Sequence, residues 1–237
     1  MNGTATAAAD DLWLELPPMA PGAPARLLVF LHGAGSSPEV IAPVALAWQL
    51  KFPGATAAIL RGLRSAAPRP GHDWFAAGAA GPGRDARIAE AVRETARRVR
   101  AVQAATGLPP ERTALVGFSQ GATIALELVR HDPALAAIVV SYAGRLARPI
   151  RRDETLFPTI HLLHGALDSQ VPALHSRRAF AGLRAVGADV TLDVAADDAH
   201  SIGQTLVNRG TARVMQTVFR GRRPQVRGPR PAGRTLH

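Results

Sequence analysis

The chain has 237 residues, no cysteine and a formal net charge of +10. This length suits one large α/β domain with a well-buried core, and the lack of cysteine excludes a disulfide scaffold, a thiol nucleophile and a thiolate metal site. Residues 1–219 carry 22 basic and 18 acidic side chains, whereas residues 220–237 carry six arginines and no acid. Because most of the excess charge lies in this terminal stretch, we predict no specific nucleic-acid partner.

Three segments are predicted along the chain. Residues 1–24 form a partly flexible N-terminal segment, residues 25–219 the α/β domain, and residues 220–237 an arginine-rich tail that has almost nothing to bury and is expected to be disordered. The start of the chain lacks the basic residues and apolar core of a signal peptide, and no run approaches the roughly 18 apolar residues of a membrane span. We expect a cytoplasmic protein without a membrane span, as a monomer or homodimer.

Short apolar runs rich in β-branched residues alternate with longer amphipathic runs along the chain. The short runs predict strands at 12–16, 26–31, 56–60, 113–118, 137–141, 159–164 and 190–194, the first of them at a sheet edge. The longer runs predict helices at 39–50, 84–106, 120–131, 173–186 and 202–219. This alternation predicts a mostly parallel sheet of about seven strands with helices on both faces.

The segment 61–84 is rich in glycine, proline and alanine, and it is too irregular for a regular element and too long for a plain connection. Loops of this length are usually functional or disordered. Because it contains Asp73, Trp74 and Phe75, we interpret it as a loop that borders a pocket. The alternative is a surface loop that the two aromatic rings anchor to the core.

A serine stands between a predicted strand and a predicted helix in residues 117–121, Gly-Phe-Ser-Gln-Gly. In such a turn the serine takes a strained conformation with positive φ and exposes its hydroxyl above the sheet. Side chains at the two flanking positions would collide with the neighbouring strand and helix, and glycine removes that collision. The pattern alone is weak, but its context predicts Ser119 as a nucleophile rather than an inert turn residue.

A serine nucleophile needs a base for its proton and a carboxylate that orients the base. Asp168 follows the sixth predicted strand and His200 the seventh, which is the order in which α/β-hydrolases deliver these groups. We expect His164, at the end of the sixth strand, to pack or hydrogen-bond beneath the site. No histidine pair has metalloprotease spacing, so we predict no metal and no cofactor. Three acids near the base compete as its orienter: Asp193, Asp197 and Asp198.

Acyl transfer also requires backbone N–H groups that face the developing oxyanion. The turn 31–35, Leu-His-Gly-Ala-Gly, follows the first core strand, where such enzymes place one donor, and Gln120 directly follows the serine. We assign the two donors to Ala34 and Gln120. A phosphate cradle in this turn is the alternative, although the turn lacks a P-loop lysine and the full Gly-x-Gly-x-x-Gly spacing.

Together these motifs resemble the phospholipase/carboxylesterase family, which includes the acyl-protein thioesterases, over residues 26–218, and they are nearest to its small bacterial esterases. The matching pieces, in the same order, are Leu-His-Gly-Ala-Gly at 31–35, Trp-Phe at 74–75, Gly-Phe-Ser-Gln-Gly at 117–121, His-Gly-x-x-Asp at 164–168 with Val-Pro at 171–172, and Asp-Ala-His at 198–200.

The resemblance implies an α/β-hydrolase fold without a cap domain. It implies Ser119 as nucleophile, His200 as general base and acid, and Asp168 as orienter, with Ala34 and Gln120 as the oxyanion hole. It further implies that Trp74 lines the acyl pocket. Ala34 stands where the family commonly has a larger aliphatic residue, which implies an acyl site of different shape.

The sequence therefore predicts a serine hydrolase that cleaves carboxylic esters or thioesters of small molecules through an acyl-enzyme intermediate. Fold and triad do not fix the leaving group, so a lysophospholipase or a peptidase on the same triad remains an alternative. A different class of function is a noncatalytic binding protein that acts through the basic tail.

Overall fold

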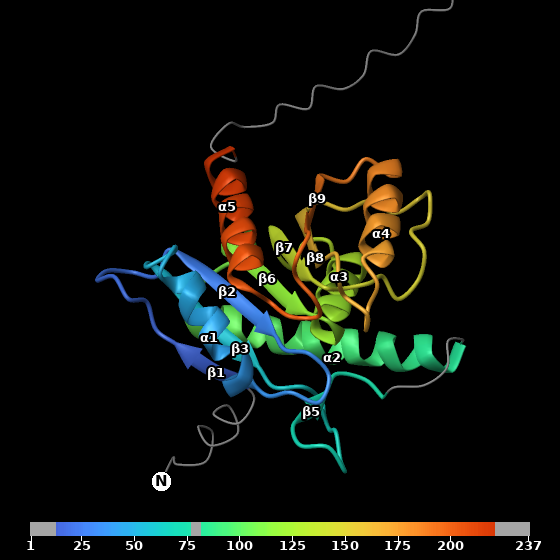
Figure 1. Ribbon diagram of the computed structural model, residues 1–237. Coiled ribbons are helices and arrows are strands. Elements are labelled where there is room, and N and C mark those ends of the chain that lie inside the picture. Colours follow the sequence, from blue (N-terminus) through green and yellow to red (C-terminus); the bar gives the residue numbers. More distant parts are fainter. Residues whose placement is uncertain (1–12, 77–81, 221–237) are drawn as a thin grey trace, which may run out of the picture.

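A seven-stranded sheet forms the centre of the computed structural model, which describes residues 13–76 and 82–220 (Figure 1). Strand β1 runs antiparallel to its neighbour β3, and every other neighbouring pair in this sheet is parallel. The strands lie across the sheet in the order β1 (Trp13–Leu16), β3 (Ala55–Leu60), β2 (Arg26–Leu31), β6 (Thr113–Phe118), β7 (Ile138–Tyr142), β8 (Thr159–Gly165) and β9 (Val190–Ala195).

Helices cover both faces of the sheet (Figure 1). One face carries α1 (Pro38–Gln49) and α5 (Gln204–Arg220), and the other carries α2 (Pro82–Thr106), α3 (Gln120–His131) and α4 (Leu174–Ala185). A short 3₁₀ turn, Pro110–Arg112, precedes β6. The seven strands and five helices expected from the sequence are confirmed, each with bounds within two residues, and together they form the α/β-hydrolase fold.

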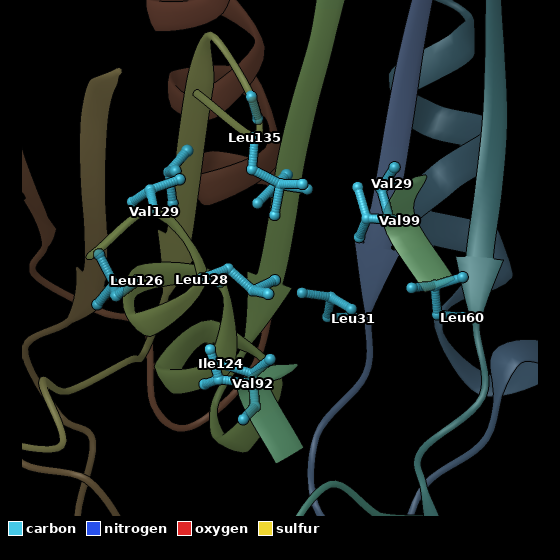
Figure 2. Packing of buried hydrophobic residues seen from close by; sticks show 14 of the residues in the cluster. Val29, Leu31, Leu60, Val92, Val99, Ile124, Leu126, Leu128, Val129 and Leu135 are labelled. Atoms are coloured by element: carbon cyan, nitrogen blue, oxygen red, sulfur yellow. The ribbon is translucent and has the colours of Figure 1, made fainter. Parts of the chain in front are cut away.

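The core on the α2–α3 side fixes the position of the turn between β6 and α3. Val92 and Val99 of α2 and Ile124 and Leu128 of α3 are almost completely buried and belong to one cluster with Leu31 at the end of β2 (Figure 2). Burying an aliphatic side chain of this size stabilises the fold by about 1.5–3 kcal/mol. The start of α3 is therefore held firmly against the end of β2.

The expectation that segment 61–84 contains no regular element is wrong in part. Arg64–Ser65 (β4) pairs antiparallel with His72–Asp73 (β5), and Ser36 forms an isolated bridge with His72. Two-residue strands are too short to show an alternating pattern in the sequence. The pairing brings Asp73 beside the turn that follows β2. Residues 77–81 of this segment lie outside the described part of the chain.

The predictions for the two ends of the chain concern mostly residues outside the described ranges. These are residues 1–12 of the predicted N-terminal segment and residues 221–237 of the predicted tail. The bounds of the central domain, 25–219, stay a prediction. Among the helices of residues 13–76 and 82–220, none has both the length and the apolar character needed to cross a bilayer.

Candidate active site

Ser119 has the backbone conformation expected of a nucleophile elbow. Its φ of 53° and ψ of −111° place it in a region that residues other than glycine rarely adopt, directly between β6 and α3. A Cβ on Gly121 would overlap the carbonyl oxygens of Leu31 and His32, and a Cβ on Gly117 would overlap the first turn of α3. The two glycines therefore allow α3 to start close to β2, which fixes the serine at the carboxyl edge of the sheet.

A chain of two hydrogen bonds joins Ser119, His200 and Asp168. The Ser119 Oγ lies 3.0 Å from His200 Nε2, and His200 Nδ1 lies 2.7 Å from Asp168 Oδ2. A carboxylate only accepts, so Nδ1 carries the proton and donates it to Asp168, which leaves Nε2 to accept from the hydroxyl. Both distances lie within the range of about 2.6–3.2 Å that proton transfer requires.

The carboxylate of Asp168 is buried and well supplied with donors. Its Oδ1 accepts hydrogen bonds from the backbone N–H groups of Gln170 at 2.9 Å and Val171 at 2.8 Å. Burial alone would raise the pKa of Asp168, but the hydrogen bonds from His200 and the two N–H groups outweigh it and lower the pKa below its usual value. Asp168 is therefore ionised at neutral pH and can hold the tautomer of His200.

His164 lies beneath the site, as expected from the sequence. It is fully buried, and its Nε2 donates to the carbonyl oxygen of Val171 at 2.6 Å and lies 3.2 Å from Asp168 Oδ2. Its Nδ1 forms a hydrogen bond with Ser176 Oγ at 2.7 Å. These contacts fix the loop that carries Asp168.

Two backbone contacts bring the loop of His200 next to the loop of Asp168. The N–H of Leu167 donates to the carbonyl oxygen of Asp198 at 3.0 Å, and the N–H of Ala166 donates to Ala195 at 2.7 Å. A Cβ on Gly165 would overlap the Asp198 carbonyl, so only glycine permits this approach. The end of β8 and the chain after β9 thus meet at one edge.

The other acids near His200 have different surroundings. Asp193 accepts two hydrogen bonds from Arg213, at 2.7 and 2.9 Å. Asp198 has one buried oxygen, Oδ2, that no described residue hydrogen-bonds. Across the described residues, the carboxylate that hydrogen-bonds His200 is that of Asp168. The geometry thus favours Asp168 over its competitors as the orienter.

Several contacts fix the turn after β2, which contains Ala34. The ring of His32 accepts from the N–H of Gly62 at 3.0 Å and donates to the carbonyl oxygen of Gly33 at 2.7 Å, and Asp73 accepts from the N–H of Gly35 at 2.7 Å. In the described part of the chain, no hydrogen bond uses the N–H of Ala34 or that of Gln120, which is the first residue of α3. These two N–H groups are available to an oxyanion.

Trp74 hydrogen-bonds both the turn after β2 and Gln120. Its side chain is 1% exposed, its Nε1 donates to the carbonyl oxygen of His32 at 2.8 Å, and its backbone N–H donates to Gln120 Oε1 at 2.7 Å. The amide of Gln120 also donates to the carbonyl oxygen of Phe75 at 3.0 Å. Trp74 therefore links the turn after β2, through His32, to the side chain of Gln120. The sequence held no signal for these contacts, because they join three distant segments.

Two cavities open at Ser119. The larger cavity, about 410 Å³, is lined by His200, by Arg69 and by the apolar side chains of Val40, Ile41, Val44, Phe118 and Ile202. The smaller cavity, about 200 Å³, is lined by Phe75, Arg84, Gln120, Thr123, Ala143, Arg145 and Val171, and Ala34 and Ser119 border both cavities. The side chain of Trp74 borders a third cavity that does not reach the serine.

The described residues offer no obvious metal site. No group of three or more His, Asp or Glu side chains in residues 13–76 and 82–220 lies close enough together to bind a metal ion. His161, on β8, is engaged by the hydroxyls of Thr191 at 2.8 Å and Thr217 at 3.0 Å, and burial lowers its pKa to about 4. It is a neutral histidine with a structural role.

Known proteins share this fold and sequence pattern. Residues 20–211 match the family described as Phospholipase/Carboxylesterase. The chain is 33% identical to the esterase YpfH of Escherichia coli strain K12 over 184 residues, which cover 77% of this chain and 79% of YpfH. It also resembles the crystal structure of esterase PE8, with a TM-score of 0.79 and 28% identity over 86% of this chain and 98% of that one.

A more distant likeness is limited to the fold. The carboxylesterase of Bacillus cereus has a TM-score of 0.74 at 17% identity, over 88% of this chain and 96% of its own. The family match spans most of the chain, and its range includes Ser119, Asp168, His200, Ala34 and Gln120. YpfH matches over most of both lengths. The chain therefore belongs to the phospholipase/carboxylesterase family.

Proposed function

We propose that this protein is a serine carboxylesterase that cleaves small-molecule esters or thioesters through an acyl-enzyme intermediate. The observation that carries this proposal is the pair of hydrogen bonds, 3.0 and 2.7 Å long, from Ser119 through His200 to Asp168. In this order the groups form a nucleophile, a base and an orienter. Membership of a family that includes the esterase YpfH supports the same reaction.

The proposed mechanism follows from the position of each atom. The Ser119 Oγ attacks the carbonyl carbon while His200 Nε2 takes the hydroxyl proton, and the carboxylate of Asp168 stabilises the resulting imidazolium. The N–H groups of Ala34 and Gln120 bind the negative oxygen of the tetrahedral intermediate. His200 then protonates the leaving oxygen or sulfur of the alcohol or thiol. In the second step a water molecule, deprotonated by His200, attacks the acyl-enzyme and releases the acid. The steps use this chain's own residues, so no cofactor is proposed.

The test is hydrolysis of p-nitrophenyl esters from acetyl to long acyl chains. We expect Ser119→Ala to lower kcat/KM by at least ~10⁴-fold, because it removes the nucleophile of a group that acts as a unit. The matched control is Ser65→Ala, an exposed serine of β4, which we expect to keep full activity. Turnover that survives in Ser119→Ala would overturn the assignment, and turnover confined to peptides or lysophospholipids would shift the substrate class.

Acyl-chain length should follow the size of the smaller cavity. Its volume of about 200 Å³ lies below the roughly 300–1,000 Å³ of pockets that hold drug-sized ligands, so we propose short acyl groups. A cytoplasmic location and a monomeric or homodimeric state also remain proposals from the sequence.

A further inference from the structure

The two cavities beside Ser119 differ in charge. Besides His200, the larger cavity is lined by apolar side chains and by uncharged polar ones, and its one arginine, Arg69, is paired with Asp73 at 3.1 Å. The smaller cavity is lined by Arg84 at the start of α2 and Arg145 in the chain after β7. Neither of these two forms an ion pair with an acid of the described residues. The smaller cavity therefore carries two arginines that no acid of residues 13–76 and 82–220 pairs with.

The surroundings of Arg84 show how poorly its charge is compensated. Its guanidinium lies 5.6 Å from the centre of the Phe75 ring, and its Nη2 is buried without a hydrogen-bond partner among the described residues. Burial and then the like charge of Arg145 lower the pKa of Arg84, while the attraction of Asp85 and Glu127 is weaker. A buried donor without a partner costs stability, and two neighbouring cations repel each other. A bound anion would relieve both effects.

The chemistry of the triad decides which half of an ester enters the smaller cavity. The leaving oxygen must lie beside His200, which protonates it, and His200 borders only the larger cavity. The predicted oxyanion donors, Ala34 and Gln120, both border the smaller cavity. A carbonyl group bound to them and attacked by Ser119 therefore directs its leaving group into the larger cavity and its acyl chain into the smaller one.

We propose that Arg84 and Arg145 form a carboxylate-binding site for the far end of the acyl chain, so that the preferred substrates are short half-esters of dicarboxylic acids with an apolar alcohol. This inference rests on the proposed esterase function and on Ser119 as the nucleophile. Arginine suits the role because its planar fork binds a carboxylate with two parallel hydrogen bonds. The apolar walls of the larger cavity suit an uncharged alcohol.

The experiment compares matched pairs of esters by pH-stat titration. Monobutyl succinate and monobutyl glutarate are set against butyl butanoate and butyl pentanoate, which have the same chain lengths without the carboxylate. We expect the wild type to prefer the half-esters in kcat/KM. We expect Arg84→Gln and Arg145→Gln each to lower the half-ester to neutral-ester ratio of kcat/KM by about 10- to 100-fold, the size of a charge-assisted hydrogen bond.

Arg148→Gln is the matched control, because Arg148 is an exposed arginine of the same connection that does not border the smaller cavity. It should leave the ratio unchanged. The preference of the wild type should also weaken as salt is added, because Arg145 is exposed. A fifth substrate, butanoyloxyacetate, carries its carboxylate on the alcohol side and should be cleaved no faster than butyl butanoate.

The outcomes separate this inference from the proposed function. Ser119-dependent cleavage of neutral esters without any preference for half-esters would overturn the carboxylate site and leave the esterase intact. A preference that both arginine variants retain, or a preference for butanoyloxyacetate, would also overturn it. Absence of Ser119-dependent cleavage for every ester would overturn the proposed function itself.

Discussion

Helix α3 has a cluster of polar and charged groups near each end, and the two clusters are built on opposite principles. Near the last turn, Arg130 binds both oxygens of Glu154, at 2.7 and 2.8 Å, and one oxygen of Glu127 at 2.7 Å. Just before the first turn, Ser119 holds a strained backbone, and the neighbouring Arg84 has a buried Nη2 that no described residue hydrogen-bonds. We call the cluster around Arg130 the closed cluster, because its charged groups are paired, and the cluster around Ser119 and Arg84 the open cluster, because it keeps strain and an unpaired donor.

The pKa values of the two arginines express the same difference. Burial lowers the pKa of both arginines. Glu154 and Glu127 outweigh this effect and raise the pKa of Arg130. The strongest charged neighbour of Arg84 is another cation, Arg145, so the pKa of Arg84 is lowered. A fold stabilises itself by satisfying its polar groups, whereas a site that binds and reacts must leave some groups unsatisfied. The comparison teaches that the two ends of α3 should respond to substitution in opposite ways.

The largest expected effect is at the open end. Asp168→Asn should lower kcat/KM by about 10⁴-fold, because an amide no longer holds His200 in the tautomer that accepts the serine proton. The measurement is ester hydrolysis, with circular dichroism to verify the fold. Asp193→Asn is the control, because it breaks only the pair with Arg213. We expect its activity within about twofold of wild type, and equal losses in the two variants would reassign the orienter.

The closed end should respond in stability instead. Arg130→Met leaves Glu127 buried, and among the described residues its remaining donor is the N–H of Ala147. We expect this change to lower the free energy of unfolding by about 3–5 kcal/mol. The folded enzyme should keep its kcat/KM, because this cluster touches neither cavity at Ser119. Urea denaturation and ester hydrolysis measure the two quantities.

Arg151→Ala provides the control for this prediction. Its ion pair with Asp153 is exposed, with 75% and 70% of the two side chains accessible, so water already screens the attraction. We expect no measurable change in the urea midpoint. If Arg130→Met were equally harmless, the closed cluster would contribute nothing to the fold; if it lowered kcat/KM of the folded enzyme, the two ends of α3 would be coupled.

The sequence predicted Ser119, Asp168 and His200 better than the groups around them, for a physical reason. Ser119, Asp168 and His200 each follow a strongly patterned strand, and the carboxyl ends of parallel strands must meet at one edge. Their convergence follows from topology alone. The strands and helices were predictable for the same reason, because burial on both faces makes their apolar runs clear.

The arginines and the supporting contacts carried no comparable signal. Arginine occurs 27 times in the chain, so Arg84 and Arg145 cannot be distinguished by residue type, and they meet only because α2 begins near the connection after β7. The contacts of Trp74 with His32 and Gln120 likewise join segments that no spacing relates. Such groups are found from packing, after the edge of the sheet is known.

The smallest expected effect tests whether the open end stores strain. Ser119→Gly should abolish esterase activity yet raise the free energy of unfolding by about 1 kcal/mol. Glycine adopts a φ of 53° without a steric penalty, and the strain that it relieves exceeds the entropy cost of a more flexible unfolded chain. Ser119→Ala is the matched control: it also removes the hydroxyl but keeps the Cβ, so it should leave stability nearly unchanged. Urea midpoints of the two inactive variants isolate the backbone term. If the Ser119→Gly variant were no more stable than the Ser119→Ala variant, the strain at the elbow would be negligible. The contrast with the closed end of α3 would then rest on unpaired charge alone.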